Sequence, residues 1–282
     1  MKITLGTVQF GLQYGISNTN GIPSDSELES IFNVANELGI KQLDTAKAYG
    51  NAEERIGNLS NSNFDIITKF PNVNSKEDLE LVLSKSLQKL NVNSIYGYLA
   101  HNANVLIQNP SFWNVLLEAK KKGKIKNIGY SLYTPEELDK LIELNYIPDL
   151  VQLPYSILDR KFEKQLSVLK SFGTEVHVRS VFLQGLYFMN PNQLPNKLQP
   201  LQSSLVELNN LCNKNDVGIG EVALNYVILN PNIDKLVIGI ETAEQLVENI
   251  NLVLNWKTNN ELFAKIEAIK IKDETLLNPV NW

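Results

Sequence analysis

Four polar residues stand at or just after the ends of three consecutive predicted strands. Asp44 ends the first of these strands, and Tyr49 lies in the loop that follows it. Lys69 and His101 end the next two. Because parallel strands end at one edge of a sheet or barrel, these four side chains should gather at one place. A carboxylate, a phenol, an ammonium and an imidazole there would form a candidate acid–base site.

This set suits proton donation to a carbonyl oxygen. A free tyrosine has a pKa of roughly 10, and we expect the Lys69 cation to lower that of Tyr49. Asp44 would hold Lys69, and His101 would orient the substrate oxygen. The sequence lacks a cysteine–histidine or multi-histidine set for a metal ion, so a hydride source would have to be an organic cofactor.

The segments that must position these residues alternate between strand and helix patterns. The expected strands are Ile3–Leu5, Gln42–Asp44, Asp65–Thr68, Ile95–Ala100, Lys126–Gly129, Leu150–Leu153, Glu175–Arg179 and Lys235–Ile238. Helix starts are predicted at Ser24, Ser75, Thr134 and Thr242, each with an acidic residue or glutamine three positions later. Asn51 with Glu54 has the same capping-box pattern.

Eight strand–helix units in 282 residues predict a single-domain α/β protein, a (β/α)8 barrel over residues 1–282. The first strand is followed by glycines that do not fit the G-x-G-x-x-G pattern of a doubly wound dinucleotide fold. Two longer loops, His101–Pro110 and Phe188–Pro200, should lie at the rim where barrel enzymes bind their substrates.

Composition excludes several other classes of protein. The net charge of −5 argues against a nucleic-acid partner, and the Lys120–Lys122 run fits a helix end. No apolar run reaches the roughly 18 residues that a membrane span requires. The single cysteine, Cys212, precludes an intramolecular disulfide and is expected to be packed on a helix. With no signal-like segment at the start, we expect a cytoplasmic protein.

The stretch Asp-Thr-Ala-Lys-Ala-Tyr-Gly-Asn-Ala-Glu at 44–53, the strand Ile-Ile-Thr-Lys at 66–69 and the histidine at 101 resemble the signature of the aldo-keto reductases. The resemblance covers almost the whole chain, from Gly6 to Asn249. It implies a (β/α)8 barrel that binds NAD(P)H in an extended pose. It also implies that Asp44, Tyr49, Lys69 and His101 are the catalytic tetrad.

The resemblance extends to cofactor contacts. Gly6, Thr7 and Asp44 would lie near the nicotinamide, and Ser131 and Gln152 would bind its carboxamide. The segment that covers the cofactor would include Arg179, Ser180 and Gln184. The adenosine end would include Gly239, Glu241, Gln245, Glu248 and Asn249.

Two residues at the cofactor site depart from the family pattern. Leu132 replaces an asparagine of the family pattern, and Gln245 stands where an arginine would grip the 2′-phosphate of NADP(H). Glu241 adds a negative charge nearby. We therefore expect a relaxed preference, with NADP(H) favoured by the family and NAD(H) also accepted. Gln245 could instead serve only as the capping partner of Thr242.

Three functions are compatible with these residues. The first is reduction of an aldehyde, ketone or sugar-like carbonyl, or the reverse oxidation. The second is a cofactor-binding regulatory subunit that senses redox state without turnover, and the third is a barrel isomerase or lyase. The substrate and the oligomeric state are not readable, although the aromatic residues Phe112, Trp113, Tyr155, Phe188 and Trp282 are candidates for lining an open pocket. His177, inside a strand, is expected to be structural.

Overall fold

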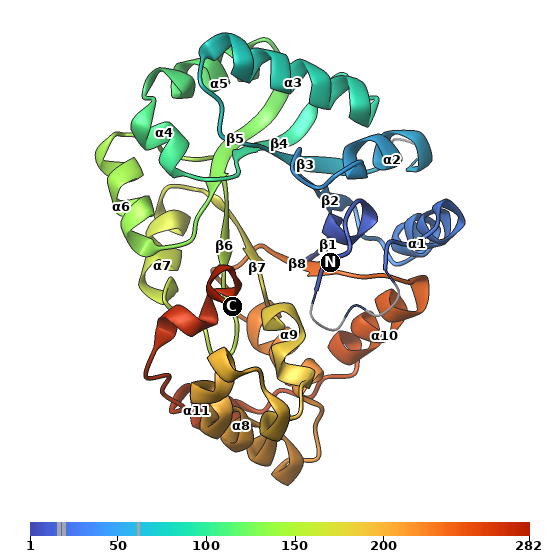
Figure 1. Cartoon of the computed structure of the whole chain (residues 1–282), viewed down its shortest axis with the longest axis vertical. Coiled ribbons are helices and arrows are strands. Elements are labelled where there is room, and N and C mark those ends of the chain that lie inside the picture. The colour runs from blue at the N-terminus through green and yellow to red at the C-terminus, as the bar shows by residue number, and fades with distance from the viewer. Residues whose placement is uncertain (16–17, 19–20, 61–62) are drawn as a thin grey trace.

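The computed structural model describes residues 1–15, 18, 21–60 and 63–282, and its eight strands form a closed parallel barrel (Figure 1). Each strand pairs with its neighbours in chain order, and β8 closes the barrel against β1. The strands are β1 (Ile3–Gly6), β2 (Gln42–Asp44), β3 (Asp65–Phe70), β4 (Ile95–Ala100), β5 (Ile125–Ser131), β6 (Leu150–Pro154), β7 (Glu175–Arg179) and β8 (Lys235–Gly239). The predicted (β/α)8 fold is confirmed, and all eight expected strands are present.

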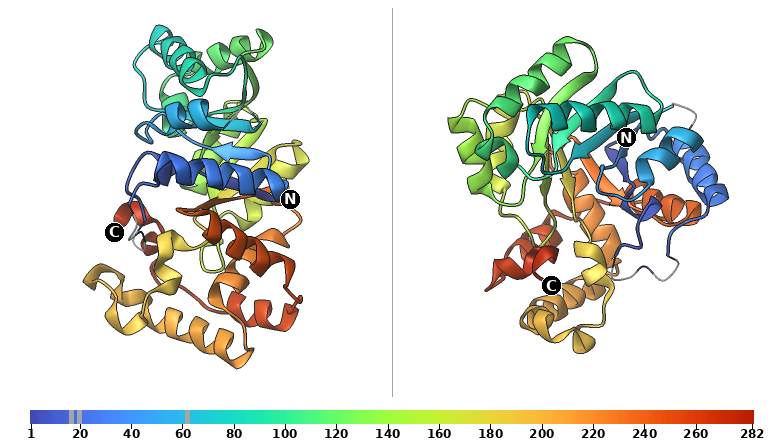
Figure 2. Two further views of the ribbon diagram at one scale, coloured as in Figure 1. Left: turned by 90° about the vertical axis from the view of Figure 1, so that its right-hand side faces the viewer. Right: turned by 45° about the horizontal axis from the view of Figure 1, so that its top comes forward.

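Helices surround the barrel, as two further views show (Figure 2). They are α1 (Asp25–Glu37), α2 (Ala52–Leu59), α3 (Lys76–Leu90), α4 (Asn104–Gln108), α5 (Ser111–Lys121), α6 (Pro135–Glu143), α7 (Glu163–Ser171), α8 (Gln202–Lys214), α9 (Ile219–Ile228), α10 (Ala243–Leu254) and α11 (Asn260–Glu267). Short 3₁₀ turns are η1 (Val8–Phe10), η2 (Leu183–Phe188), η3 (Pro191–Gln193), η4 (Asn196–Leu201), η5 (Glu274–Leu277) and η6 (Pro279–Asn281).

The helix starts follow the sequence signals, with one exception. The side chains of Ser24, Ser75 and Thr242 accept a backbone N–H three residues on, and Thr134 forms a complete capping box. The capping box expected at Asn51 is wrong. Asn51 occupies the N-cap position of α2 but makes no side-chain cap bond, because its backbone (φ −101°, ψ 15°) is not extended.

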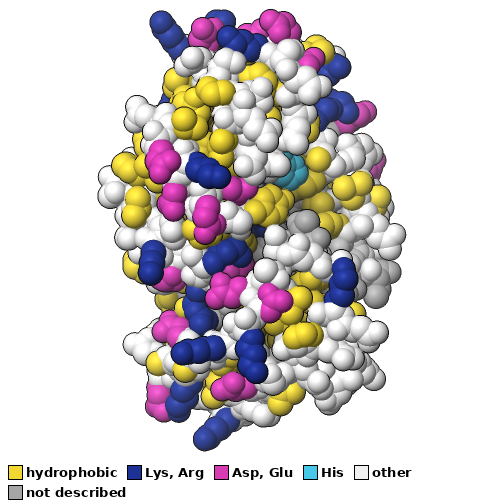
Figure 3. All heavy atoms as spheres, turned by 60° about the vertical axis from the view of Figure 1, so that its left-hand side comes forward, with side chains coloured by type: hydrophobic (Ala, Val, Ile, Leu, Met, Phe, Trp, Pro, Cys, Tyr) yellow, Lys and Arg dark blue, Asp and Glu magenta, His cyan; other side chains and the backbone are white. Residues whose placement is uncertain are grey.

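The predicted loops are more structured than expected. The first, 101–110, contains α4, and the second, 188–200, contains η3 and all of η4 except its last residue, Leu201. Cys212 is buried on α8, and the Lys120–Lys122 run ends α5, both as predicted. No helix in the described ranges is long and apolar enough to cross a bilayer. The face drawn in Figure 3 carries acidic and basic side chains interspersed.

The core has two parts that follow from the alternation of side chains along strands. A large cluster packs the helices onto the outside of the barrel. A second, smaller cluster is separate from the first and contains Ile67, Leu99 and Leu150. Ile66 belongs to the outer cluster and Ile67 to the inner one, so Lys69 shares the inner face of β3 with Ile67. The strand thus carries Lys69 into the barrel.

Candidate active site

Asp44 and Lys69 form a buried ion pair at the carboxyl ends of β2 and β3. Lys69 Nζ lies 2.6 Å from Asp44 Oδ2 and donates a second hydrogen bond to the Thr45 carbonyl at 3.0 Å. The Lys69 side chain is 0% exposed and that of Asp44 is 4% exposed. Burial lowers the pKa of Lys69 from its ordinary value, and the neighbouring carboxylate of Asp44 opposes that effect. Asp44 therefore positions Lys69 and holds its proton.

Tyr49 and His101 lie beside this pair. The Tyr49 and His101 rings meet edge to face with centroids 5.7 Å apart, and Lys69 Nζ lies 5.3 Å from the centre of the Tyr49 ring. Three consecutive strands and the loop after β2 thus bring the four predicted residues together.

The expected effect of Lys69 on Tyr49 is not what the structure shows. The pKa of Tyr49 is raised above its ordinary value, first by burial and then by the Asp44 carboxylate. Asp44 offsets part of the Lys69 charge at 2.6 Å, so in the protein alone the cation does not outweigh the effect of burial on the Tyr49 pKa. Tyr49 therefore holds its proton firmly in the protein alone.

His101 has the opposite shift. Burial and the nearby cations Lys69 and Arg179 lower its pKa to about 4. Its imidazole is therefore neutral near pH 7. A neutral imidazole can donate one hydrogen bond and accept another, which suits the positioning of an oxygen atom.

These groups face a cavity of about 740 Å³ that we name the main cleft. With one exception, every residue predicted for catalysis or cofactor binding lines it. They are Gly6, Thr7, Asp44, Tyr49, His101, Ser131, Gln152, Arg179, Ser180, Gln184, Gly239, Glu241, Gln245, Glu248 and Asn249. The exception is Lys69, which lies behind Asp44 and is 1% exposed.

The nicotinamide-side candidates are connected to the ion pair. Gln152 Nε2 donates to Asp44 Oδ1 at 2.7 Å, and the Thr7 hydroxyl donates to the Asp44 carbonyl at 3.0 Å. Leu132, where the family pattern has an asparagine, is fully buried, and its carbonyl accepts a hydrogen bond from Arg179. The Arg179 guanidinium stacks over the ring of Tyr133 at 4.6 Å.

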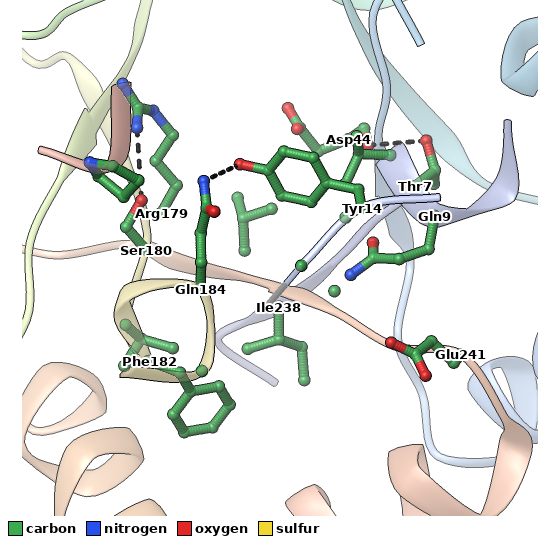
Figure 4. Close-up of a pocket in the computed structure, with 18 of the residues that line it drawn as sticks. Thr7, Gln9, Tyr14, Asp44, Arg179, Ser180, Phe182, Gln184, Ile238 and Glu241 are labelled. Atoms are coloured by element: carbon green, nitrogen blue, oxygen red, sulfur yellow. Dashed lines mark hydrogen bonds between the residues drawn. The ribbon is translucent and has the colours of Figure 1, made fainter. Parts of the chain in front are cut away.

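The loop after β7 is bent by an unusual backbone. Ser180, Leu183 and Gln184 have positive φ values of 66°, 44° and 53°, which residues other than glycine seldom adopt. Gln184 Nε2 donates to the hydroxyl of Tyr14, from the loop after β1, and Figure 4 shows the two side chains pointing toward one another. Two loops distant in sequence thus meet at the main cleft.

Sequence reasoning missed several lining residues, among them Gln9, Tyr14, Tyr133 and Phe182. Their only signal was position, since each follows a predicted strand. Gln9 packs against Gly239 so closely that a Cβ there would lie 2.5 Å from its amide nitrogen. Its buried Oε1 has no hydrogen-bond partner among the residues that the structure describes. An unsatisfied acceptor in the wall of the cleft fits a polar ligand.

The aromatic candidates for the pocket were mostly wrong. Phe188 lines the main cleft, but Phe112, Trp113 and Tyr155 are buried in the outer core. Trp113 stacks on Tyr146 instead, and Tyr155 on Tyr226. Trp282 packs at the edge of the core, and from the C-terminal segment it is Pro279 that lines the main cleft.

Two further predictions concern structural residues. His177 is fully buried, and its Nε2 lies 2.8 Å from Glu175 Oε1, as expected for a structural histidine. The capping alternative for Gln245 is realised in part: its backbone N–H donates to Thr242 Oγ1 at 3.2 Å, whereas its side-chain Oε1 accepts the Glu241 N–H at 2.8 Å in place of that of Thr242. Within the described residues, no group of three or more potential ligands could hold a metal ion.

The aldo/keto reductase family model matches residues 2–271. This chain belongs to the aldo/keto reductase family. Among curated relatives, L-glyceraldehyde 3-phosphate reductase of Escherichia coli K12 is 24% identical over 94% of this chain and 89% of its own length. NADH-specific methylglyoxal reductase of the same organism is 26% identical over 77% and 79%.

Solved structures of other family members share the fold. Aldo-keto reductase AKR11C1 from Bacillus halodurans, in its holo form, superposes with a TM-score of 0.79 at 21% identity over 95% of this chain and 92% of that one. Glycerol dehydrogenase AKR11B4 from Gluconobacter oxydans gives 0.75 at 20% identity over 95% and 90%. Both are similar to this chain in fold.

Proposed function

We propose that this aldo/keto reductase transfers hydride between a nicotinamide dinucleotide and the carbonyl carbon of a small aldehyde, ketone or sugar-like molecule. The observation that carries the proposal is one continuous cleft. Tyr49, His101 and Asp44 line it together with the candidate cofactor residues of β1, β5, β6 and β8. Named relatives that reduce glyceraldehyde 3-phosphate and methylglyoxal support the same class of reaction.

The residues present fit the cofactor. Ser131 and the amide of Gln152 would hold the nicotinamide carboxamide, and Gln9 Oε1, without a partner among the described residues, offers a further acceptor. Arg179, at the end of β7, and Ser180, in the loop that also carries Gln184, would cover the middle of the dinucleotide. When bound and reduced, the nicotinamide supplies the hydride.

The protein's own part in the reaction is to deliver one proton. Tyr49, kept protonated by burial, would donate its phenolic proton to the carbonyl oxygen as the carbon gains hydride, which yields the alcohol. His101, neutral near pH 7, would hydrogen-bond that oxygen and set its direction. The Lys69 ammonium, held by Asp44, would stabilise the phenolate that forms on Tyr49 once its proton has been transferred.

Cofactor choice depends on the adenosine end. Glu241, Gln245, Glu248 and Asn249 line it, and Arg179 is the sole lysine or arginine among the described residues around the whole cleft. A 2′-phosphate would therefore meet carboxylates and amides without a cation to bind it. The family favours NADP(H), but this lining supports acceptance of NAD(H) as well.

A screen of aldehydes, ketones and sugars with NADH and NADPH tests the proposal. Turnover is measured by the change in absorbance of the reduced nicotinamide. Deuterium placed on the transferable position of the reduced cofactor should appear on the carbinol carbon of the product. Tight cofactor binding with no turnover of any carbonyl would favour a regulatory subunit instead. Failure of both cofactors to bind in a fluorescence titration would favour an isomerase or lyase.

A further inference from the structure

A second hollow adjoins the catalytic end of the main cleft, and we name it the side cavity. Its volume is about 450 Å³, within the range of small-molecule sites. Its lining residues are Pro71, Asn72, His101, Asn102, Asn104, Tyr133, Glu137 and Asn278. His101 and Tyr133 line both hollows. A substrate whose carbonyl meets Tyr49 and His101 could therefore extend into the side cavity.

The lining is dominated by primary amides. Four of its eight residues are asparagines, from the loop after β3, the loop after β4, α4 and the C-terminal segment. An amide side chain offers two donor hydrogens and an acceptor oxygen, so it can bind a hydroxyl group that donates or accepts. Apolar substrates would gain little from such a wall.

Two of the asparagines are held in place. Asn102 Oδ1 accepts the Asn104 backbone N–H at 3.0 Å, and Asn104 Nδ2 donates to Glu137 Oε1 at 2.9 Å. Orientation fixed in advance lowers the entropy that binding must overcome.

The charge of the side cavity is negative. Glu137 is the charged residue of the described lining, and its Oε2 accepts the backbone N–H groups of Tyr133 and Thr134 at 2.7 and 3.2 Å. No lysine or arginine belongs to the described lining, and His101 is neutral near pH 7 because its pKa is about 4. A phosphate or carboxylate group on the substrate would meet Glu137 with no cation in the described lining, because Arg179 lies over the ring of Tyr133 and donates to the Leu132 carbonyl.

We infer that the side cavity is a subsite for the hydroxylated part of an uncharged, polyhydroxylated carbonyl compound. This inference rests on the proposed function. It separates this chain from its relative named for glyceraldehyde 3-phosphate, whose substrate carries a phosphate. The asparagines recognise the hydroxyl groups, and Glu137 disfavours anions.

A matched series of four-carbon aldehydes tests the inference: erythrose, erythrose 4-phosphate and butanal. We expect kcat/KM for erythrose, corrected for its free-aldehyde fraction, to exceed that of both others by roughly tenfold, which corresponds to about 1.4 kcal/mol. A preference for the phosphate or for butanal would overturn the subsite assignment while leaving carbonyl reduction intact. Turnover of none of the three, together with none in the wider screen, would instead count against the proposed function.

Substitutions localise the effect. Asn72→Leu should raise the KM for erythrose roughly 3- to 10-fold and should not raise the KM for butanal, because it replaces a partner of the hydroxyl groups with an apolar side chain. Asn74→Leu is the matched control, since Asn74 is an exposed neighbour in the same loop outside the lining. Glu137→Gln keeps an oxygen that can cap α6 and should improve the KM for erythrose 4-phosphate several-fold. An equal response to Asn72→Leu and Asn74→Leu would contradict the assignment.

Discussion

The Lys69–Asp44 pair shows how strand periodicity places a charge in the barrel interior. Lys69 is two residues beyond Ile67 on the inner face of β3, so it points inward beside the carboxylate that ends β2. The sequence predicted the partners because both lie at strand ends. It did not predict the direction of the Tyr49 pKa shift, because burial and charge neutralisation depend on distances that only the folded barrel sets.

Breaking this ion pair should destabilise the protein strongly. Lys69→Met would leave the Asp44 carboxylate buried without a counter-charge, and we expect a loss of about 3–5 kcal/mol in the free energy of unfolding. Urea denaturation measures it. The double variant Asp44→Asn/Lys69→Met should recover much of that loss, and a double variant as unstable as the sum of the two single variants would show that the residues do not act as a pair.

The lowered pKa of His101 predicts how the stability of the protein depends on pH. Its pKa is about 4 in the folded protein, below the ordinary value of roughly 6.5. As the pH falls from 6.5 toward 4, the unfolded chain binds a proton at His101 that the folded chain does not, so stability falls. His101→Asn should lose less stability than the wild type between pH 7 and pH 4.5 in urea titrations. Identical losses would show that His101 titrates normally.

At the scale of elements, loop geometry was the least predictable part of the site. The loop after β1 reaches the loop after β7 through Tyr14 and Gln184, and neither strand pattern nor helix caps indicate that contact. The same holds for α4, a five-residue helix inside a predicted loop. Such contacts arise from the tertiary structure, which places sequence-distant loops on one rim.

The α10 terminus carries the prediction for cofactor choice. Gln245→Arg would place a cation beside the candidate adenosine end, and we expect the affinity for NADPH to rise roughly tenfold, because a charge-assisted hydrogen bond to a phosphate forms. Fluorescence titration measures both cofactors, and the affinity for NADH should change far less. Val247→Arg adds the same charge to an exposed position of α10 outside the cleft. An equal gain from both variants would point to net charge alone.

At the scale of the whole molecule, the barrel could be predicted because strand and helix signals alternate through the chain. Eight strand segments and four well-marked helix caps were enough for the topology, since β–α–β connections permit few alternatives. The cleft followed from the same logic, because strand ends meet at one rim. The prediction that aromatic residues line the pocket was mostly wrong for the opposite reason. Nothing in the sequence around Phe112, Trp113 and Tyr155 distinguishes a side chain that faces the core from one that faces the cleft.

The most direct test of the account is a paired measurement on Tyr49→Phe. This change removes the phenolic proton and keeps the ring that packs beside His101. We predict that the dissociation constants for NADH and NADPH stay within about twofold, while kcat for carbonyl reduction falls by roughly 10²–10⁴-fold. Unchanged turnover with unchanged cofactor binding would remove Tyr49 as the proton donor and contradict the central claim.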